Sequence, residues 1–173
     1  MDAEKLKALQ NPLKERYRAD PSVALVTLRA AGQAMEGITC KLETGKALLE
    51  AGLHPATGGD GTLACSGDML LEALVACAGV TLRAVATAIG IGLRGARVLA
   101  EGDLDFRGTL GVSKDASVGF RDLRLRFELD TDASEEQRAT LMRLTERYCV
   151  VLQTLRVPPA ISVEQIFPSQ PQG

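Results

Sequence analysis

The feature that most constrains the fold is a long, weakly charged apolar segment in the middle of the chain, from Met69 to Leu93. Apolar residues occupy nearly every side of a helix drawn over it, which is typical of a helix enclosed by other elements. A membrane span of similar length would expose Glu72 and Arg83 to lipid at several kcal/mol each. We therefore predict a buried helix and no membrane association. Such a helix is hard to cover within one small domain, which favours an intertwined dimer.

The start of this helix is marked by capping signals. Ser66 is the expected N-cap, and Asp68 lies in the first turn, where the helix dipole favours an anion. The preceding segment, residues 53–68, is rich in Gly, Pro and small residues and predicts a loop. Small residues on the helix would allow another element to approach closely: Ala73, Ala76, Ala78 and Gly79.

Strands are predicted on both sides of the helix. Residues 96–106 and 120–130 alternate apolar and charged side chains, as expected for an antiparallel sheet with one face packed on the helix. Before the helix, residues 24–30 and 37–43 predict two strands joined by a turn, which Lys46 to Glu50 extend or follow.

A second helix follows the later strands. Ser134 and Gln137 form a capping box, and the helical pattern then runs over residues 135–155. Its inner face is predicted to carry Leu141, Thr145, Cys149 and Leu152. Pro158 and Pro159 end this helix, and residues 160–167 read as a final strand. The fold class is therefore α+β.

Composition excludes several functions. The 173 residues suit one domain. The net charge of −2 does not predict the positively charged surface that nucleic-acid binding requires. With 3% aromatic residues and no Trp, a base-stacking platform is not expected. The four cysteines form no CxxC pair, so we predict neither a metal site nor a cofactor. The polar first twenty residues lack a signal-peptide core, and we expect a reducing, cytoplasmic location.

The cysteines differ in what they could do. Cys40 lies at one of the apolar positions of its predicted strand, so its thiol is predicted to pack in the core. Cys65 precedes a helix N-terminus, which lowers a thiol pKa, although the nearby carboxylate of Asp68 opposes this effect. Cys77 is too far along its helix to use the dipole, so a reactive Cys77 needs a cationic side chain supplied by the fold, whereas periodicity by itself makes it a core residue. Cys65 and Cys77 are roughly 18 Å apart along one helix and cannot form a disulfide. If a redox couple exists, Cys77 with Cys149 on the second helix is the natural candidate.

Two cysteine motifs resemble the signatures of a known family. The stretch GGDGTLACSGDMLLEALVACAGVTLRAVA is similar to the first motif of the OsmC/Ohr thiol-dependent peroxidases, in which Gly-Gly is followed by an acidic loop, then Leu-Leu-x-Ala-Leu-x-x-Cys and Thr-Leu. RYCVVLQTL is similar to the second, with Cys149 at the cysteine position. The resemblance covers residues 20–167 of a single domain, 1–173, with residues 1–19 as a helical extension.

The resemblance implies a fold and a reaction. It implies antiparallel sheets packed around the central helix and a second helix in an intertwined homodimer. Cys77 would attack an organic hydroperoxide and become a sulfenic acid, and Cys149 would resolve it to a disulfide that an external dithiol reduces. In the family, an Arg paired with a Glu activates the thiol.

The chain departs from the family pattern around the expected acid. Asp68 replaces the Glu, Gly67 occupies the position of the working Glu in the organic-hydroperoxide branch, and the Pro-x-Pro of the loop is Cys65-Ser66-Gly67. The Pro after the second cysteine is Val150, so the helix need not break there. The activating Arg has three candidates, of which Arg18 is preferred over Arg16 and Arg29.

Two other functions remain open from the sequence. The same fold could serve as a non-catalytic ligand-binding or redox-sensing protein, with its thiols in an apolar pocket. Alternatively, Cys65 could be the nucleophile. His54, the only histidine, precedes the helix and could assist proton transfer, although a solvated loop histidine is the simpler interpretation.

Overall fold

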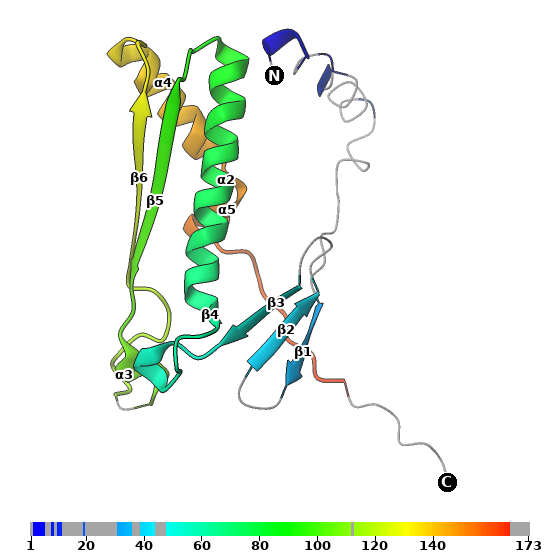
Figure 1. The fold of residues 1–173 in the computed structure, drawn as a ribbon, viewed down its shortest axis with the longest axis vertical. Coiled ribbons are helices and arrows are strands. Elements are labelled where there is room, and N and C mark those ends of the chain that lie inside the picture. The colour runs from blue at the N-terminus through cyan, green and yellow to red at the C-terminus, as the bar shows by residue number, and fades with distance from the viewer. Residues whose placement is uncertain are drawn as a thin grey trace.

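The computed structural model describes residues 2–5, 8, 10–11, 19, 31–35, 39–43, 48–111 and 113–166. The predicted strand at 24–30 and most of the N-terminal extension lie outside these residues. In chain order the elements are β1 (Ala31–Met35), β2 (Thr39–Glu43), β3 (Leu48–Gly52), the 3-10 helix η2 (Pro55–Thr57), β4 (Ala64–Cys65), α2 (Ser66–Ile89), β5 (Gly95–Asp103), α3 (Phe106–Thr109), β6 (Asp122–Asp130), α4 (Glu135–Tyr148) and α5 (Val150–Arg156) (Figure 1). The predicted α+β class is confirmed.

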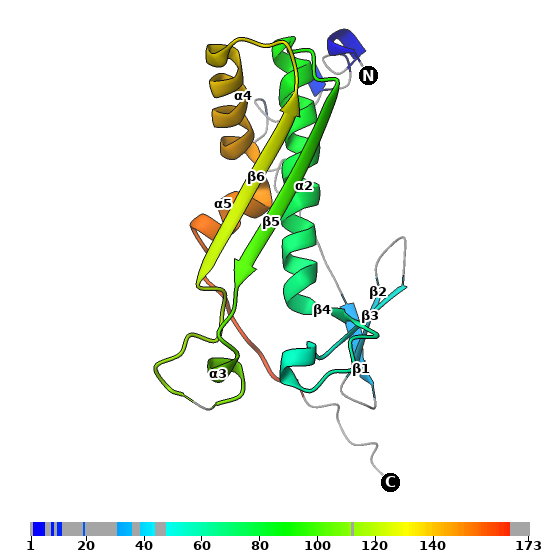
Figure 2. The ribbon, with the colours of Figure 1, turned by 60° about the vertical axis from the view of Figure 1, so that its left-hand side comes forward.

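Helix α2 is the axis of the molecule, and the β5–β6 hairpin lies along it (Figure 2). The antiparallel register sets Val98 opposite Phe127 and Ala100 opposite Leu125, so these apolar side chains share one face. They pack with Leu74 and Ala78 of α2. The predicted packing of a dry sheet face on the central helix is therefore confirmed.

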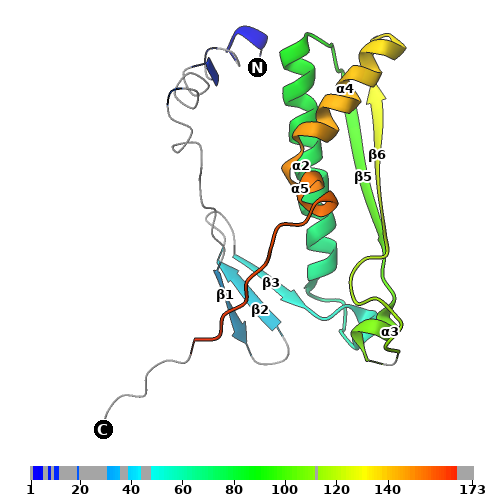
Figure 3. The same ribbon diagram turned by 180° about the vertical axis from the view of Figure 1, so that it is seen from behind.

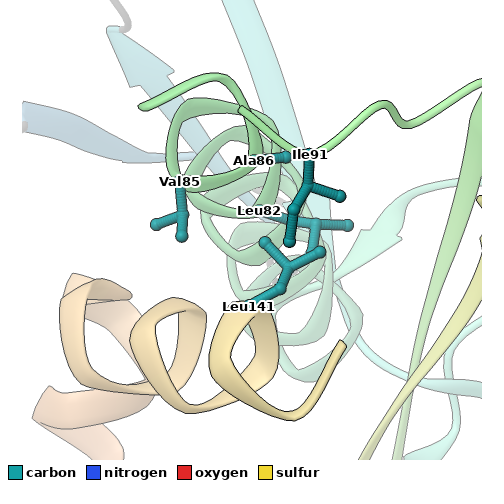
Figure 4. Close-up of a cluster of buried hydrophobic side chains, with 5 residues drawn as sticks. All are labelled: Leu82, Val85, Ala86, Ile91 and Leu141. Atoms are coloured by element: carbon teal, nitrogen blue, oxygen red, sulfur yellow. The ribbon is translucent and has the colours of Figure 1, made fainter. Parts of the chain in front are cut away.

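Helices α4 and α5 pack against α2 and also contact apolar residues of β6 (Figure 3). The capping box predicted at Ser134 is present: its hydroxyl accepts from the Gln137 backbone N–H, and the Gln137 side chain accepts from the Ser134 N–H. Leu141 of α4 is fully buried against a cluster from α2 and the turn after it, shown in Figure 4: Leu82, Val85, Ala86 and Ile91. This cluster holds α4 against α2.

The segment before α2 differs from its prediction in two ways. The chain forms β1 at 31–35, where the sequence suggested a turn, and pairs it antiparallel with β2. Residues 53–68, predicted to be a loop, contain η2, β4 and the first turn of α2. The helix begins one residue earlier than predicted, with Cys65 as its N-cap in place of Ser66. Asp68 does lie in the first turn.

The C-terminal half holds two further corrections. The predicted helix over 135–155 is interrupted at Cys149, which divides it into α4 and α5. The described part of the predicted final strand, residues 160–166, forms no secondary structure and is exposed. A strand requires a neighbour for its backbone groups, and within the described chain this segment pairs with no strand.

The single chain does not bury α2 on all sides, and the expected cover by a second copy stays a prediction. The four-stranded sheet β1–β2–β3–β4 lies beside the N-terminal end of α2 and does not cover its length (Figures 1 and 3). One face stays open: Val80 is 72% exposed, and Leu70, Ala73 and Ala76 are also exposed. Among the described helices, α2 alone has the length and composition of a membrane span, a test that core helices of soluble proteins also pass.

Candidate active site: a thiol pair where α4 meets α5

The structure brings Cys77 and Cys149 together. Cys77 lies in the middle of α2 and is partly exposed, whereas Cys149, between α4 and α5, is completely buried. Cys149 packs with Leu74 and Ala78, which flank Cys77 on α2, and its thiol hydrogen-bonds to the Cys77 sulfur. The two thiols are therefore in contact, with only one of them open to solvent.

The break in the helix at Cys149 creates polar surroundings for these sulfurs. Cys149 has φ −74° and ψ 105°, an extended conformation that ends α4 and begins α5. Its N–H still donates to the Thr145 carbonyl at 3.0 Å, and its carbonyl accepts from the Gln153 N–H at 2.9 Å. The N–H groups at the start of α5 consequently have no carbonyl of α4 to bond. These N–H groups, at Val150 and Val151, hydrogen-bond to the Cys77 sulfur. The helix thus breaks after Cys149 even though this chain has Val150 in place of the Pro of the family.

These groups favour the thiolate of Cys77. Burial by itself raises the pKa of the Cys77 thiol, but hydrogen bonds from the Val151 N–H, the Cys149 thiol, the Val150 N–H and the Thr81 hydroxyl outweigh burial and leave the pKa below its ordinary value. A thiolate is the nucleophilic form of cysteine, so Cys77 has the character of an attacking sulfur.

Cys149 has the opposite character. Burial, and then the proximity of the Cys77 sulfur, raise the pKa of the Cys149 thiol above its ordinary value, against the effect of the N–H groups of Leu152 and Val151. A buried, protonated thiol does not compete for an incoming oxidant. It can still attack a neighbouring sulfur once that sulfur is oxidised.

No charged side chain in the described part of the chain acts on the Cys77 pKa. The candidate activating residues Arg16, Arg18 and Arg29 lie outside the described residues, so the expected role of Arg18 stays a prediction. Among the described residues, the groups that lower the pKa of Cys77 are backbone N–H groups and neutral side-chain donors.

The structure does not bring Asp68 to the thiol pair. Asp68 lies nine residues before Cys77 on one helix, roughly 13 Å away along its axis. Together with His54 and Cys65 it lines a different cavity of about 330 Å³ at the start of α2, whose apolar wall includes Phe106 and Phe120. Any contribution of Asp68 to Cys77 would have to act over that distance.

His54 is held within this second cavity. Its Nδ1 accepts from the Ala56 N–H at 3.0 Å, and its ring stacks on Phe106 at 4.8 Å between centroids. His54 and Cys65 are thus both remote from Cys77. The side chain of Cys40 lies outside the described part of the structure, and the described residues include no cluster of three or more His, Cys, Asp or Glu that could hold a metal ion.

An apolar cavity of about 340 Å³ adjoins the buried side of the thiol pair. Its walls come from β6, α4, α5 and α2, and an ion pair between Arg156 and Glu146 at 2.8 Å lies at its edge. Leu74 and Leu152 belong both to this cavity and to the cluster around Cys149.

Sequence reasoning missed two components of the site. The first is Thr81, whose spacing of four residues from Cys77 on one helix was a usable signal. The second is the pair of N–H groups at Val150 and Val151. They could not be predicted, because the sequence does not show that the helix ends at Cys149.

A family model and solved structures match this chain. The model of the OsmC family, described as OsmC-like protein, matches residues 59–164, which include both cysteine motifs. The chain therefore belongs to the OsmC family. Its order of strands and helices and its central helix agree with that assignment. A search of curated proteins finds no match.

The solved structures are alike in fold at low sequence identity. An OsmC-like protein from Mycoplasma pneumoniae superposes with a TM-score of 0.65 at 17% identity, covering 77% of this chain and 89% of that one. An organic hydroperoxide resistance protein OsmC from Legionella pneumophila gives 0.61 at 18%, covering 77% and 93%. An organic hydroperoxide resistance protein from Elizabethkingia anophelis gives 0.62 at 15%, covering 78% and 91%. The chain is thus a divergent member of its family.

Proposed function

We propose that this chain is a thiol-dependent peroxidase that reduces organic hydroperoxides through Cys77 and Cys149. The observation that carries the proposal is the asymmetry of the two thiols. Cys77 is partly exposed with a lowered pKa, and it contacts Cys149, which is buried with a raised pKa. The family, and the hydroperoxide resistance proteins of the same fold, support a role in peroxide resistance.

The proposed reaction divides the work between the two sulfurs. The Cys77 thiolate attacks the terminal oxygen of the hydroperoxide, the O–O bond breaks, and the departing alkoxide takes a proton and leaves as an alcohol. Cys77 is then a sulfenic acid. Cys149 attacks the Cys77 sulfur, a disulfide forms and the hydroxyl group leaves as water. An external dithiol supplies two electrons and two protons to restore both thiols. We expect this cycle to run in a reducing compartment such as the cytoplasm.

A single oxidation experiment tests this proposal. We expect one equivalent of cumene hydroperoxide to convert the reduced protein rapidly to a species with a Cys77–Cys149 disulfide, because the two sulfurs are already in contact. Peptide mass spectrometry without reduction identifies the linked peptides, and hydrogen peroxide at the same concentration serves as the comparison oxidant. Four intact thiols after prolonged exposure would contradict the proposal.

One arrangement of residues favours a second candidate, a non-catalytic ligand-binding or redox-sensing protein. Asp68 is remote from Cys77, and within the described chain no cation acts on the thiol. The apolar cavity beside Cys149 would then hold a ligand. In that case Cys77 would react slowly with hydroperoxide, and a fluorescent fatty acid such as parinaric acid would bind with saturation.

We also propose that a second copy of the chain covers the open face of α2, as in the intertwined homodimers expected from the resemblance. Val80 and its exposed apolar neighbours would otherwise face water. We expect wild-type protein to elute as a dimer in size-exclusion chromatography with light scattering. Val80→Glu would place a charge in the interface and shift the population toward monomer, whereas Arg97→Glu on the outer face of the hairpin would not. A monomeric wild type would refute the dimer.

A further inference from the structure

Thr145 carries a buried hydroxyl that is unused in the structure. The residue has no exposed surface, and its Oγ1 finds no hydrogen-bond partner among the described residues. A buried hydroxyl without a partner is destabilising, and such groups in native proteins need a physical reason. A helical threonine commonly bonds its hydroxyl to the carbonyl one turn earlier, and Thr145 does not.

The position of Thr145 relates it to the thiol pair. It precedes Cys149 by four residues, and the Cys149 N–H donates to its carbonyl at 3.0 Å, which keeps Cys149 directly above it on the inner face of α4. Side chains at this spacing are neighbours, with Cβ atoms about 6 Å apart. Both residues are completely buried, so water cannot solvate either side chain.

The protonation state of Cys149 decides whether this hydroxyl has a strong acceptor to donate to. A neutral thiol is a weak acceptor, so protonated Cys149 offers little to a hydroxyl donor. A thiolate at the same place is a charged acceptor, and burial opposes its charge more than the N–H groups of Leu152 and Val151 offset. The hydroxyl of Thr145 is therefore idle in one state and a useful further donor in the other.

That charged state arises when the disulfide is reduced. Cys77 is the more exposed sulfur, so a thiolate of the external dithiol attacks Cys77. The new sulfur–sulfur bond forms there as the Cys77–Cys149 bond breaks, and its electron pair leaves on Cys149 as a buried thiolate. The second thiol of the reductant then displaces Cys77 and completes the transfer of two electrons, and Cys149 takes up a proton.

We propose that the Thr145 hydroxyl helps to stabilise the departing Cys149 thiolate, and that it thereby speeds reduction of the disulfide. This inference rests on the proposed peroxidase cycle only for its biological purpose. The physical claim requires no more than a disulfide between these two cysteines.

The test measures reduction separately from oxidation. Diamide is used to form the Cys77–Cys149 disulfide, which is then reduced with dithiothreitol at neutral pH, and the released thiols are trapped by rapid alkylation. We expect Thr145→Val to slow this step about tenfold, the scale of one hydrogen bond to a charged group, and Thr145→Ser to remain close to wild type. Thr87→Val, which removes a helix hydroxyl bonded to the Arg83 carbonyl, is the matched control and should change nothing.

Two further measurements separate this role from packing. Valine is nearly isosteric and removes an unpaired polar atom, so the reduced Thr145→Val protein should melt higher by about 2–4 °C while its disulfide is reduced more slowly. In a Cys77→Ser background, alkylation of the Cys149 peptide should shift to higher pH when Thr145 becomes Val. A purely structural residue would give neither result.

The outcomes are distinct. An unchanged reduction rate in Thr145→Val would overturn the inference, as would equal slowing by Thr145→Ser. Failure of diamide to form the disulfide would also overturn it. If Thr145→Val does not fold, Thr145→Ala removes the same hydroxyl and decides the question. A normal Thr145 effect with no reaction toward hydroperoxide would leave this inference standing and refute the peroxidase.

Discussion

Replacing Cys77 with serine is expected to lower the rate of organic hydroperoxide reduction by at least about a thousand-fold, the scale on which removal of a covalent nucleophile acts. A serine hydroxyl in the same place stays protonated and cannot attack the O–O bond at neutral pH. The donors around residue 77 cannot compensate, because they act by stabilising a thiolate. Stopped-flow consumption of cumene hydroperoxide by the reduced protein measures the effect.

Cys65→Ser is the matched control for this experiment. Cys65 also lies on a cavity and near a helix N-terminus, but that cavity is the one shared with His54 and Asp68. We expect its rate to stay within about twofold of wild type, as for other substitutions remote from the site. The reverse pattern, with Cys65→Ser inactive and Cys77→Ser active, would identify Cys65 as the nucleophile.

Replacing Cys149 with serine should separate the first turnover from the rest of the cycle. Cys77 should still react once and accumulate as a sulfenic acid, which dimedone traps and mass spectrometry detects. Steady-state turnover with a dithiol should fall at least about a hundred-fold, because an intermolecular thiol replaces one already held in contact. The serine hydroxyl is also a hydrogen-bond donor, so the first step should stay close to the wild-type rate.

The outcome that contradicts this prediction is equally specific. Full steady-state turnover in Cys149→Ser would mean that the external thiol attacks the sulfenic acid directly. Cys149 would then be a core residue beside the nucleophile, and the effect of Thr145 on disulfide reduction would have no part in the catalytic cycle.

The elements that could be predicted from sequence are those fixed by local pattern. The period-two alternation before and after residues 107–119 predicted the β5–β6 hairpin, and the capping box at Ser134 predicted the start of α4. The spacing of Leu141, Thr145 and Cys149 predicted which face of α4 is buried, and all three are indeed inaccessible. Local chemistry determines each of these features, so no knowledge of the tertiary structure was needed.

The features that escaped prediction depend on partners distant in sequence. The helix break at Cys149 is accompanied by packing of α5 as well as α4 on α2, and no Pro or Gly marks it. The lowered pKa of Cys77 depends in turn on N–H groups released by that break. The hydrophobicity of α2 indicates that its open face will be covered, but it does not show which residues of this chain, or of a second copy, cover it.

The helix break between Tyr148 and Val150 favours the reactivity of Cys77 and lowers the stability of the helix. A continuous helix through Cys149 would satisfy the first N–H groups of α5 with carbonyls of α4, and it would be favoured by any substitution that promotes helix formation there. The same N–H groups would then be withdrawn from the sulfur of Cys77. A substitution that made the helix continuous is therefore expected to raise the pKa of the Cys77 thiol and to weaken it as a nucleophile.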